Sequence, residues 1–179
     1  MHRSPGKNWS EQSGPTGHAP SASTAAAIKA ALPTQRFNRD KSPAEQSALS
    51  AVDESLPTLL ASIRKRDGLA AGLGFDLLVV IDGGDLEDML AALSELITLD
   101  PQLFLRQLKS RDPVSPTLLT FMGERFVDRK PTARCNELRA RHRSLSGVRD
   151  VELEQPRRRC QAILSKAIRQ CEAQRSTSR

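Results

Sequence analysis

Apolar residues recur every three or four positions along several stretches of the chain, which is the spacing of helices that bury one face. The first stretch begins at Pro43, where Ser42 and Glu45 have the spacing of a capping box and proline suits the first helical position. Its buried face is predicted to hold Leu49, Val52, Leu56, Leu59, Leu60 and Ile63. Pro57 lies inside this pattern, so we expect it to kink the helix or split it in two.

Further helix starts are indicated by acidic, hydroxyl or proline residues that precede apolar periodicity. We predict helices that begin at Asp85, Asp100–Pro101, Ser115–Pro116 and Pro131. Asp85 is expected to be the N-cap of the first of them. These starts are about fifteen residues apart, a cadence typical of stacked helical hairpins. A last helix begins at Asp150 or near Pro156 and carries the apolar residues Cys160, Ile163, Leu164, Ala167, Ile168 and Cys171.

Between these regular stretches lies a glycine-rich segment whose structure the pattern leaves open. Gly68, Gly72 and Gly74 superficially resemble a phosphate-binding loop, but no Gly-Lys-Ser/Thr follows and the G-x-G-x-x-G order is absent. We therefore interpret the segment as a flexible connection between helices. Residues 75–81 fit either a buried strand or a short buried helix, and we favour the helix because no second strand is available to pair with them.

These patterns predict an all-α fold: a compact array of five to seven short helices, of the helical-hairpin or α-solenoid-like kind. Residues 1–43 are rich in Ser, Pro, Gly and Ala. They cannot bury enough apolar surface to offset the entropy of ordering, so we predict a disordered N-terminal arm. Residues 44–173 are predicted to form a single helical domain, long enough to bury one core, and residues 174–179 a frayed C-terminal tail.

Charge is divided unevenly along the chain. The formal net charge is +6, yet residues 67–128 hold four basic and eleven acidic residues, whereas residues 129–179 hold fourteen basic and five acidic ones. Such asymmetry can steer a nucleic acid or an acidic partner toward the basic part, or hold the two parts against each other. No aromatic residue follows Phe126, so base stacking is not available in the basic part.

Two charged clusters are the candidate contact residues. The candidate partner or phosphate contacts are Arg134, Arg139, Arg141, Arg143, Arg157, Arg158 and Arg159. The candidate acidic cluster is Asp82, Asp85, Glu87 and Asp88. The acidic residues could gather around a hard cation, but capping of a helix N-terminus explains all of them, so we predict no metal there.

The three cysteines do not form an obvious disulfide framework. Cys160 and Cys171 lie on one helix about 16 Å apart and cannot bond to each other, whereas Cys135 could meet either of them across a helical hairpin. Their odd number favours buried thiols in a reducing compartment. A zinc site that combines the three thiols with His142 is conceivable, but the close C-x-x-C spacing is missing, and we expect core thiols and a boundary histidine.

No catalytic or cofactor motif is present. The sequence has no G-x-S-x-G, no H-E-x-x-H and no visible nucleophile–base pair, although Glu95, Asp100 and Glu124 could still assemble in space. We therefore predict a non-catalytic protein-interaction domain, a scaffold or adaptor, with another protein as partner and no cofactor. The alternative is a nucleic-acid-binding module that uses the basic helices of residues 129–179.

The sequence also yields expectations about location. The longest aliphatic run is Leu77–Ile81, too short for a transmembrane helix, and the first twenty residues lack the apolar stretch of a secretory signal peptide. We expect a cytoplasmic protein. A third interpretation treats the Ser/Pro/Gly/Thr-rich arm as the export signal of a secreted bacterial effector. The oligomeric state stays open.

Overall fold

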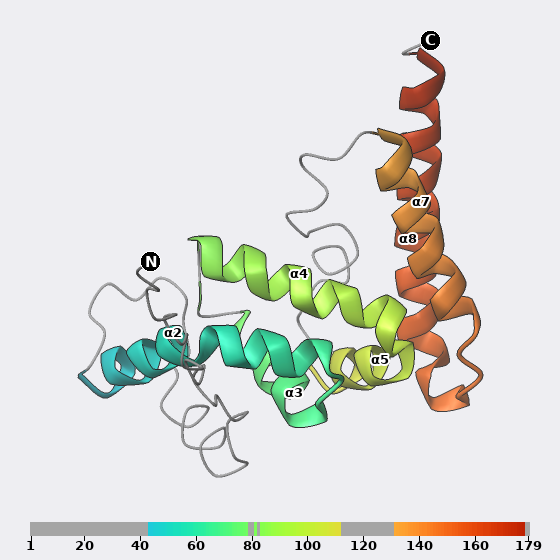
Figure 1. The fold of residues 1–179 in the computed structure, drawn as a ribbon. Coiled ribbons are helices and arrows are strands. Elements are labelled where there is room, and N and C mark those ends of the chain that lie inside the picture. The colour runs from blue at the N-terminus through green and yellow to red at the C-terminus, as the bar shows by residue number, and fades with distance from the viewer. Residues whose placement is uncertain (1–42, 79–80, 82, 112–130, 178–179) are drawn as a thin grey trace, which may run out of the picture.

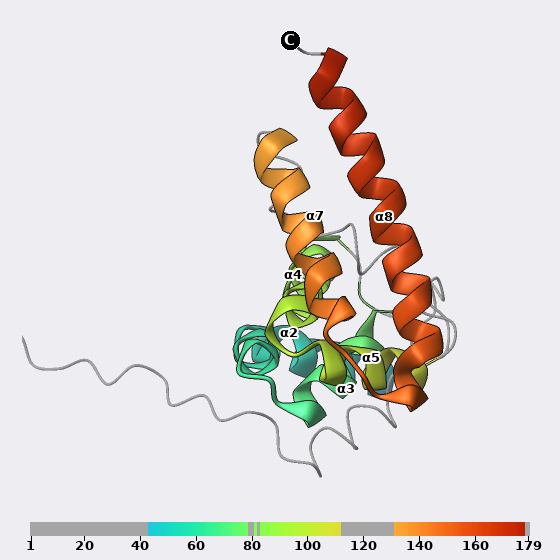
Figure 2. The same ribbon diagram turned by 90° about the vertical axis from the view of Figure 1, so that its right-hand side faces the viewer.

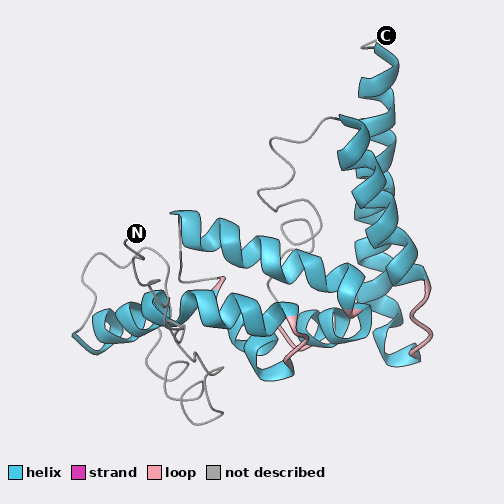
Figure 3. Cartoon of the chain, viewed as in Figure 1, coloured by secondary structure: helices cyan, strands magenta, loops and turns pink. Residues whose placement is uncertain are grey.

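In a computed structural model, the described part of the chain consists of residues 43–78, 81, 83–111 and 131–177. Its elements are α2 (Pro43–Arg64), α3 (Gly68–Leu77), α4 (Gly83–Leu99), α5 (Pro101–Lys109), α7 (Pro131–Ser146), the 3-10 helix η2 (Val151–Leu153) and α8 (Glu154–Thr177). Within these ranges the chain is helix and connecting loop without a strand, as Figures 1 and 3 show. The predicted all-α array is confirmed.

Several predicted helix starts are confirmed. α2 begins at Pro43 and α7 at Pro131. α5 begins at Pro101, where Asp100 Oδ1 accepts a hydrogen bond of 2.8 Å from the amide of Leu103. α2 is a single helix across Pro57 and is not split there. The predicted arm and the helix expected after Ser115–Pro116 lie outside the described residues, apart from position 43.

The glycine-rich segment is a helix, and our interpretation of it as a flexible connection is wrong. Asp67 caps α3 by accepting hydrogen bonds of 2.9 Å from the amides of Leu69 and Ala70. Gly72 and Gly74 are required in this helix because neighbouring side chains leave little room for a Cβ atom. A Cβ on Gly74 would lie 2.8 Å from Ile63 Cδ1 and 2.9 Å from Met89 Sδ. In the stretch 75–81, for which we favoured a helix, residues 75–77 are the end of α3 and residue 78 is a turn, so that expectation is confirmed only for residues 75–77.

Two boundaries differ from prediction. α4 begins at Gly83, so Asp85 lies in its first turn and is not the N-cap. Gly83 has a φ of +59°, which glycine adopts without steric cost. The start of the last helix was left open between Asp150 and Pro156. The Asp150 carboxylate caps η2 by accepting a hydrogen bond from the amide of Glu152, and α8 follows from Glu154. α8 continues to Thr177, into the stretch 174–179 that we expected to fray.

The four helices α2 to α5 form the body of the molecule. α2 packs along α3 and α4, and α5 packs against α3 and α4 (Figure 1). The rings of Phe75 and Phe104 meet in the body core with centroids 5.9 Å apart. The largest side chains that are fully buried there are Leu59, Ile63, Leu77, Met89, Leu90, Leu93, Leu96, Ile97 and Leu105. Burial of these apolar groups provides the main stabilisation of the body.

The last two helices form a hairpin that leaves the body. α7 and α8 pack along each other, and the base of the hairpin packs on the body through contacts of α7 with α4 and of α8 with α5. In both views of Figures 1 and 2 the hairpin rises beyond the body, and the C-terminus lies at its far end. The apolar seam of the hairpin continues the body core, so one buried cluster extends from Val52 to Cys171.

Candidate functional site: the α7–α8 hairpin

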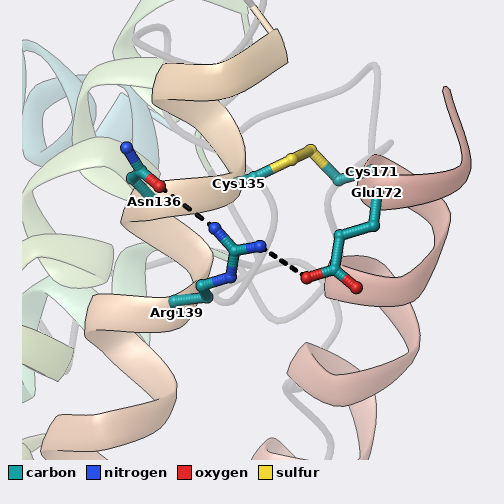
Figure 4. The surroundings of a disulfide bond; sticks show 5 residues. All are labelled: Cys135, Asn136, Arg139, Cys171 and Glu172. Carbon is teal, nitrogen blue, oxygen red and sulfur yellow. Dashed lines mark hydrogen bonds and ion pairs between the residues drawn. A yellow bond between two sulfur atoms is a disulfide. The ribbon is translucent and has the colours of Figure 1, made fainter. Parts of the chain in front are cut away.

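A disulfide closes the far end of the hairpin. Cys135, in the second turn of α7, is bonded to Cys171 near the end of α8, with 5.8 Å between their Cα atoms (Figure 4). The expectation of buried thiols is therefore wrong for this pair, and Cys171 is the partner of Cys135 among the two alternatives left open. The physical reason is topological: the hairpin brings together helix ends that are 36 residues apart in the sequence.

Cys160 remains a buried thiol, as expected for it. It is completely buried, and this burial raises the pKa of its thiol to about 12. The zinc arrangement that we considered does not form, because two of its three thiols are bonded to each other. Within the described residues no group of three or more His, Cys, Asp and Glu side chains is arranged to hold a metal ion.

An ion pair lies beside the disulfide. Arg139 of α7 reaches Glu172 of α8 at 2.5 Å and also donates a hydrogen bond of 3.1 Å to Asn136 Oδ1, as Figure 4 shows. Arg139 was a candidate partner contact, and in the structure it links the two helices. The covalent bond and the ion pair together fix the spacing of α7 and α8 at the end that has no support from the body.

The opposite end of the hairpin is held by hydrogen bonds. Arg157 Nη1 donates to the carbonyl oxygen of Val148 at 3.1 Å, and the side-chain amide of Gln161 donates to Ser146 Oγ at 2.8 Å. These bonds tie the first turns of α8 to the end of α7. Arg157, another candidate contact, thus orders the connection between the helices.

The remaining candidate arginines occupy different environments. Arg141 is only 2% exposed, and its guanidinium pairs with Glu137 at 2.9 Å inside the hairpin. Arg134 is half-buried. Arg158 is exposed and paired with Glu154 one turn earlier. Arg143 and Arg159 are exposed. The structure therefore does not bring the seven arginines together into one surface cluster.

Every carboxylate between residues 131 and 174 is engaged by the protein itself. Three pair with arginines of the hairpin, namely Glu137, Glu154 and Glu172. Asp150 caps η2. Glu152 accepts a hydrogen bond from Lys109 of α5 at 2.6 Å, and this bond together with the lysine charge lowers the pKa of the Glu152 carboxyl. Acidic groups that could neutralise the remaining cations of the hairpin are therefore already in use.

Exposed cations remain on the hairpin after these pairings. Five of them form no ion pair with any described residue: Arg143, Arg149, Arg159, Lys166 and Arg169. Three belong to the exposed side of α8, which we call the α8 face and define as Gln155, Arg159, Ala162, Lys166, Arg169, Gln170 and Ala173. Their spacing places these seven residues on one side of the helix. The α8 face contains no carboxylate.

The candidate acidic cluster is a helix start. Asp85 and Asp88 are half-buried and Glu87 is exposed at the N-terminal end of α4, whereas Asp82 lies outside the described residues. Acidic side chains are favoured in this position by the helix dipole. Lys and Arg are absent from the sequence between residues 67 and 105, and two of the carboxylates there pair with cations of other segments, Glu95 with Arg64 and Asp76 with Arg111.

Sequence reasoning missed one polar cluster in the body. Arg111 Nε donates to Asp76 Oδ1 at 2.6 Å, and Arg111 Nη1 donates to Gln107 Oε1 at 2.5 Å. A Cβ on Gly72 would lie 3.0 Å from Arg111 Nη2, so this glycine makes room for the guanidinium. The sequence carries no signal for a pair that is 35 residues apart. The cluster fastens the end of α5 to α3.

No protein-family model matches the chain, and neither a curated protein nor a solved structure matches it. None of the helices in the described ranges combines the length and the apolar character that crossing a membrane requires.

Proposed function

We propose that this chain is a non-catalytic interaction domain that presents the α7–α8 hairpin to another protein. The observation that carries the proposal is the disulfide at the end of the hairpin that projects beyond the body (Figures 1 and 4). A cross-link at that position stabilises the shape of the projecting part and adds nothing to the packing of the body. Such a part is suited to contact a partner that approaches from outside.

The base of the hairpin supports this role because it holds the hairpin firmly on the body. Leu145, Val148 and Leu153 are almost completely buried at the base, and Lys109 pairs with Glu152 across the junction. A rigid attachment lowers the entropy that would be lost when a partner binds. The hairpin can therefore present its exposed side chains in a fixed orientation.

The chemistry of the hairpin favours binding over catalysis. Cys160 keeps its proton because burial raises its pKa to about 12, and a protonated thiol is a poor nucleophile. The arginines that are buried or paired hold the helices together. What the hairpin offers to the outside is charge on a rigid helical surface.

The disulfide also leads us to propose a location different from the cytoplasm that the sequence suggested. Disulfides persist in oxidising compartments and are rare in the reducing cytosol. The Cys135–Cys171 bond joins α7 and α8 at the projecting end of the hairpin, so its reduction would release that end. We propose that the protein acts where this bond stays formed.

Nucleic-acid binding by residues 129–179 is the second candidate. The observation in its favour is the set of five exposed cations on the hairpin that have no ion pair among the described residues. Lys and Arg side chains of this kind contact phosphates. The same experiment can test both candidates.

A photo-reactive amino acid can be placed at Ala162 or Gln170 on the α8 face, and at Ala51 or Ala61 on α2 as exposed controls. We expect irradiation of the oxidised protein in extracts of its source to give a discrete protein adduct from the α8 positions and none from the α2 positions. Adducts whose shifted mobility is abolished by nuclease treatment would establish the nucleic-acid alternative. Adducts from α2 alone, or none at all, would contradict both.

A further inference from the structure

We infer that the α8 face binds an acidic helical segment of a partner protein. The inference rests on the proposed function and specifies the chemical class of the partner. It starts from the charge left over on the hairpin: Arg159, Lys166 and Arg169 are exposed, lie on one side of α8 and form no ion pair with a described residue. The neighbouring Arg158 is already paired with Glu154.

The geometry of this face suits an extended, regularly spaced anion. Arg159 and Lys166 are seven residues apart, about 10 Å along the helix axis, and Arg169 follows one turn later. The three cations thus form a stripe about 15 Å long. Glutamates seven residues apart on a helix laid beside α8 would have the same repeat. Opposite charges at matching spacing determine the register and choice of partner in paired helices.

The side chains between the cations favour a flat contact. Ala162 and Ala173 are small and Gln155 and Gln170 are polar, so the α8 face offers neither an apolar groove nor a projecting anchor. Small residues allow the backbone of a second helix to approach, at the interaxial distances of 8–10 Å that packed helices adopt. Residues 131–174 contain no Phe, Tyr or Trp side chain on which a base could stack.

The charge of the body distinguishes an acidic peptide from a nucleic acid. The hairpin base packs against α4, which holds four acidic residues and no Lys or Arg, and against α5, whose Lys109 is already paired with Glu152. A long polyanion that followed the hairpin onto α4 would be repelled by the carboxylates of that helix. A short acidic segment can remain along α8 and avoid that repulsion. The observations therefore favour a protein partner.

The test is binding of the full-length oxidised protein to a labelled synthetic helix, measured by fluorescence anisotropy at about 20 mM and about 150 mM salt. The peptide carries glutamates along one side of an alanine-rich helix. Its first control has the same composition with the glutamates distributed around the helix, and its second is a labelled DNA duplex. We expect the one-sided peptide to bind most tightly and its affinity to fall with salt.

Two charge-matched variants identify the surface. The double variant Arg159→Glu/Lys166→Glu reverses two cations of the α8 face, and Lys65→Glu/Arg106→Glu reverses two exposed cations of the body. We expect at least a tenfold loss of peptide affinity for the first variant and less than a threefold loss for the second. A peptide with lysines in place of the glutamates should bind the first variant more tightly than it binds the wild type.

Other outcomes would overturn the inference in distinguishable ways. Equal losses in both variants would show attraction by net charge alone. Duplex DNA that binds more tightly than the peptide, with the same sensitivity to Arg159→Glu/Lys166→Glu, would make the partner a nucleic acid. No peptide binding at low salt would overturn the acidic partner, while protein adducts from the α8 positions would leave the proposed function standing. If the charge-reversed variant loses its helical circular dichroism, Arg159→Gln/Lys166→Gln replaces it, with a loss of at least threefold expected.

Discussion

At the scale of single residues, two glycines of α3 show how absent side chains set the packing of the body. Gly74 faces Ile63 and Met89, both fully buried, and Gly72 faces the guanidinium of Arg111. Glycine inside a helix costs up to about 1 kcal/mol relative to alanine because it loses more backbone freedom. The close approach of the neighbouring helices offsets that cost.

The first prediction concerns Gly74→Ala. The new methyl group would lie within 3 Å of Ile63 and Met89, whose side chains have little space to move in the core. We expect a net loss of about 1–2 kcal/mol in the free energy of unfolding, because the cost of overpacking exceeds the gain in helix propensity. Urea denaturation measures it. Gly84→Ala is the control: no atom lies within 4 Å there, and its stability should be equal or higher. A Gly74→Ala protein as stable as the control would contradict the tight contact.

The second prediction concerns Cys160 and alkaline pH. Its thiol pKa is about 12 in the folded protein and near 9 when exposed, so above pH 9 the unfolded chain releases a proton that the folded chain retains. The contribution of this group to stability is therefore complete below pH 9 and declines between pH 9 and 12. We expect the free energy of unfolding to fall by about 1 kcal/mol more between pH 8 and 10 than in Cys160→Ala. Parallel slopes for the two proteins would show an accessible thiol.

Arg141 and Arg139 illustrate what the sequence could not provide at this scale. Both belong to a run of basic residues in α7, and nothing in the pattern distinguishes them from Arg143. In the structure Arg141 is buried with Glu137, Arg139 pairs with Glu172 across the hairpin, and Arg143 is exposed. These fates depend on the rotation of α7 against α8, which is a tertiary property. Of the seven candidate arginines, only Arg143 and Arg159 belong to the five exposed hairpin cations that form no ion pair with a described residue.

At the scale of elements, helix starts were the most predictable features, because caps act locally. Asp100–Pro101 and Pro131 mark real helix starts. α3 was missed because its glycines are explained only by contacts with Ile63, Met89 and Arg111, which are distant in the sequence. The disulfide was left open for the same reason: Cys160 and Cys171 were both compatible with Cys135 until the register of the hairpin was known.

The third prediction concerns the hairpin as an element. The disulfide spans 36 residues and closes the end of the hairpin that has no support from the body. Loss of such a cross-link costs up to about 4 kcal/mol in the chain-entropy description. We expect reduction, or Cys135→Ser/Cys171→Ser, to increase hydrogen exchange of the amides in residues 131–138 and 167–174, while α3 and α4 keep their protection. Cys160→Ala, which leaves the cross-link intact, should not show this pattern. Uniform loss of protection along the chain would mean that hairpin and body open together.

At the scale of the whole molecule, one apolar core supports two parts of opposite charge. Residues 67–105 carry only acidic charges, while the hairpin has exposed cations that form no ion pair with the described body. The core continues from Val52 in α2 to Cys171 in α8, so burial joins the two parts, with the Lys109–Glu152 ion pair added at the junction. The sequence indicated the division of charge and the class of fold. It could not show that the charges stay apart, because that depends on where the hairpin attaches.

The fourth prediction follows from the position of this core. Its first buried residue in the described chain is Val52, well after the predicted disordered arm. A chain that begins at Ser42 should therefore keep the helical circular dichroism and the melting temperature of the full protein, and its α8 face should bind the acidic peptide equally well. A chain that begins at Pro57 is the control, because it loses Val52 and Leu56 from the core and should melt at a lower temperature.

If delivery out of the producing cell fails for the chain that begins at Ser42 while folding and binding persist, the arm acts as an export signal. A lower melting temperature for that chain would instead show that residues 1–41 pack on the domain, contrary to the prediction of a disordered arm.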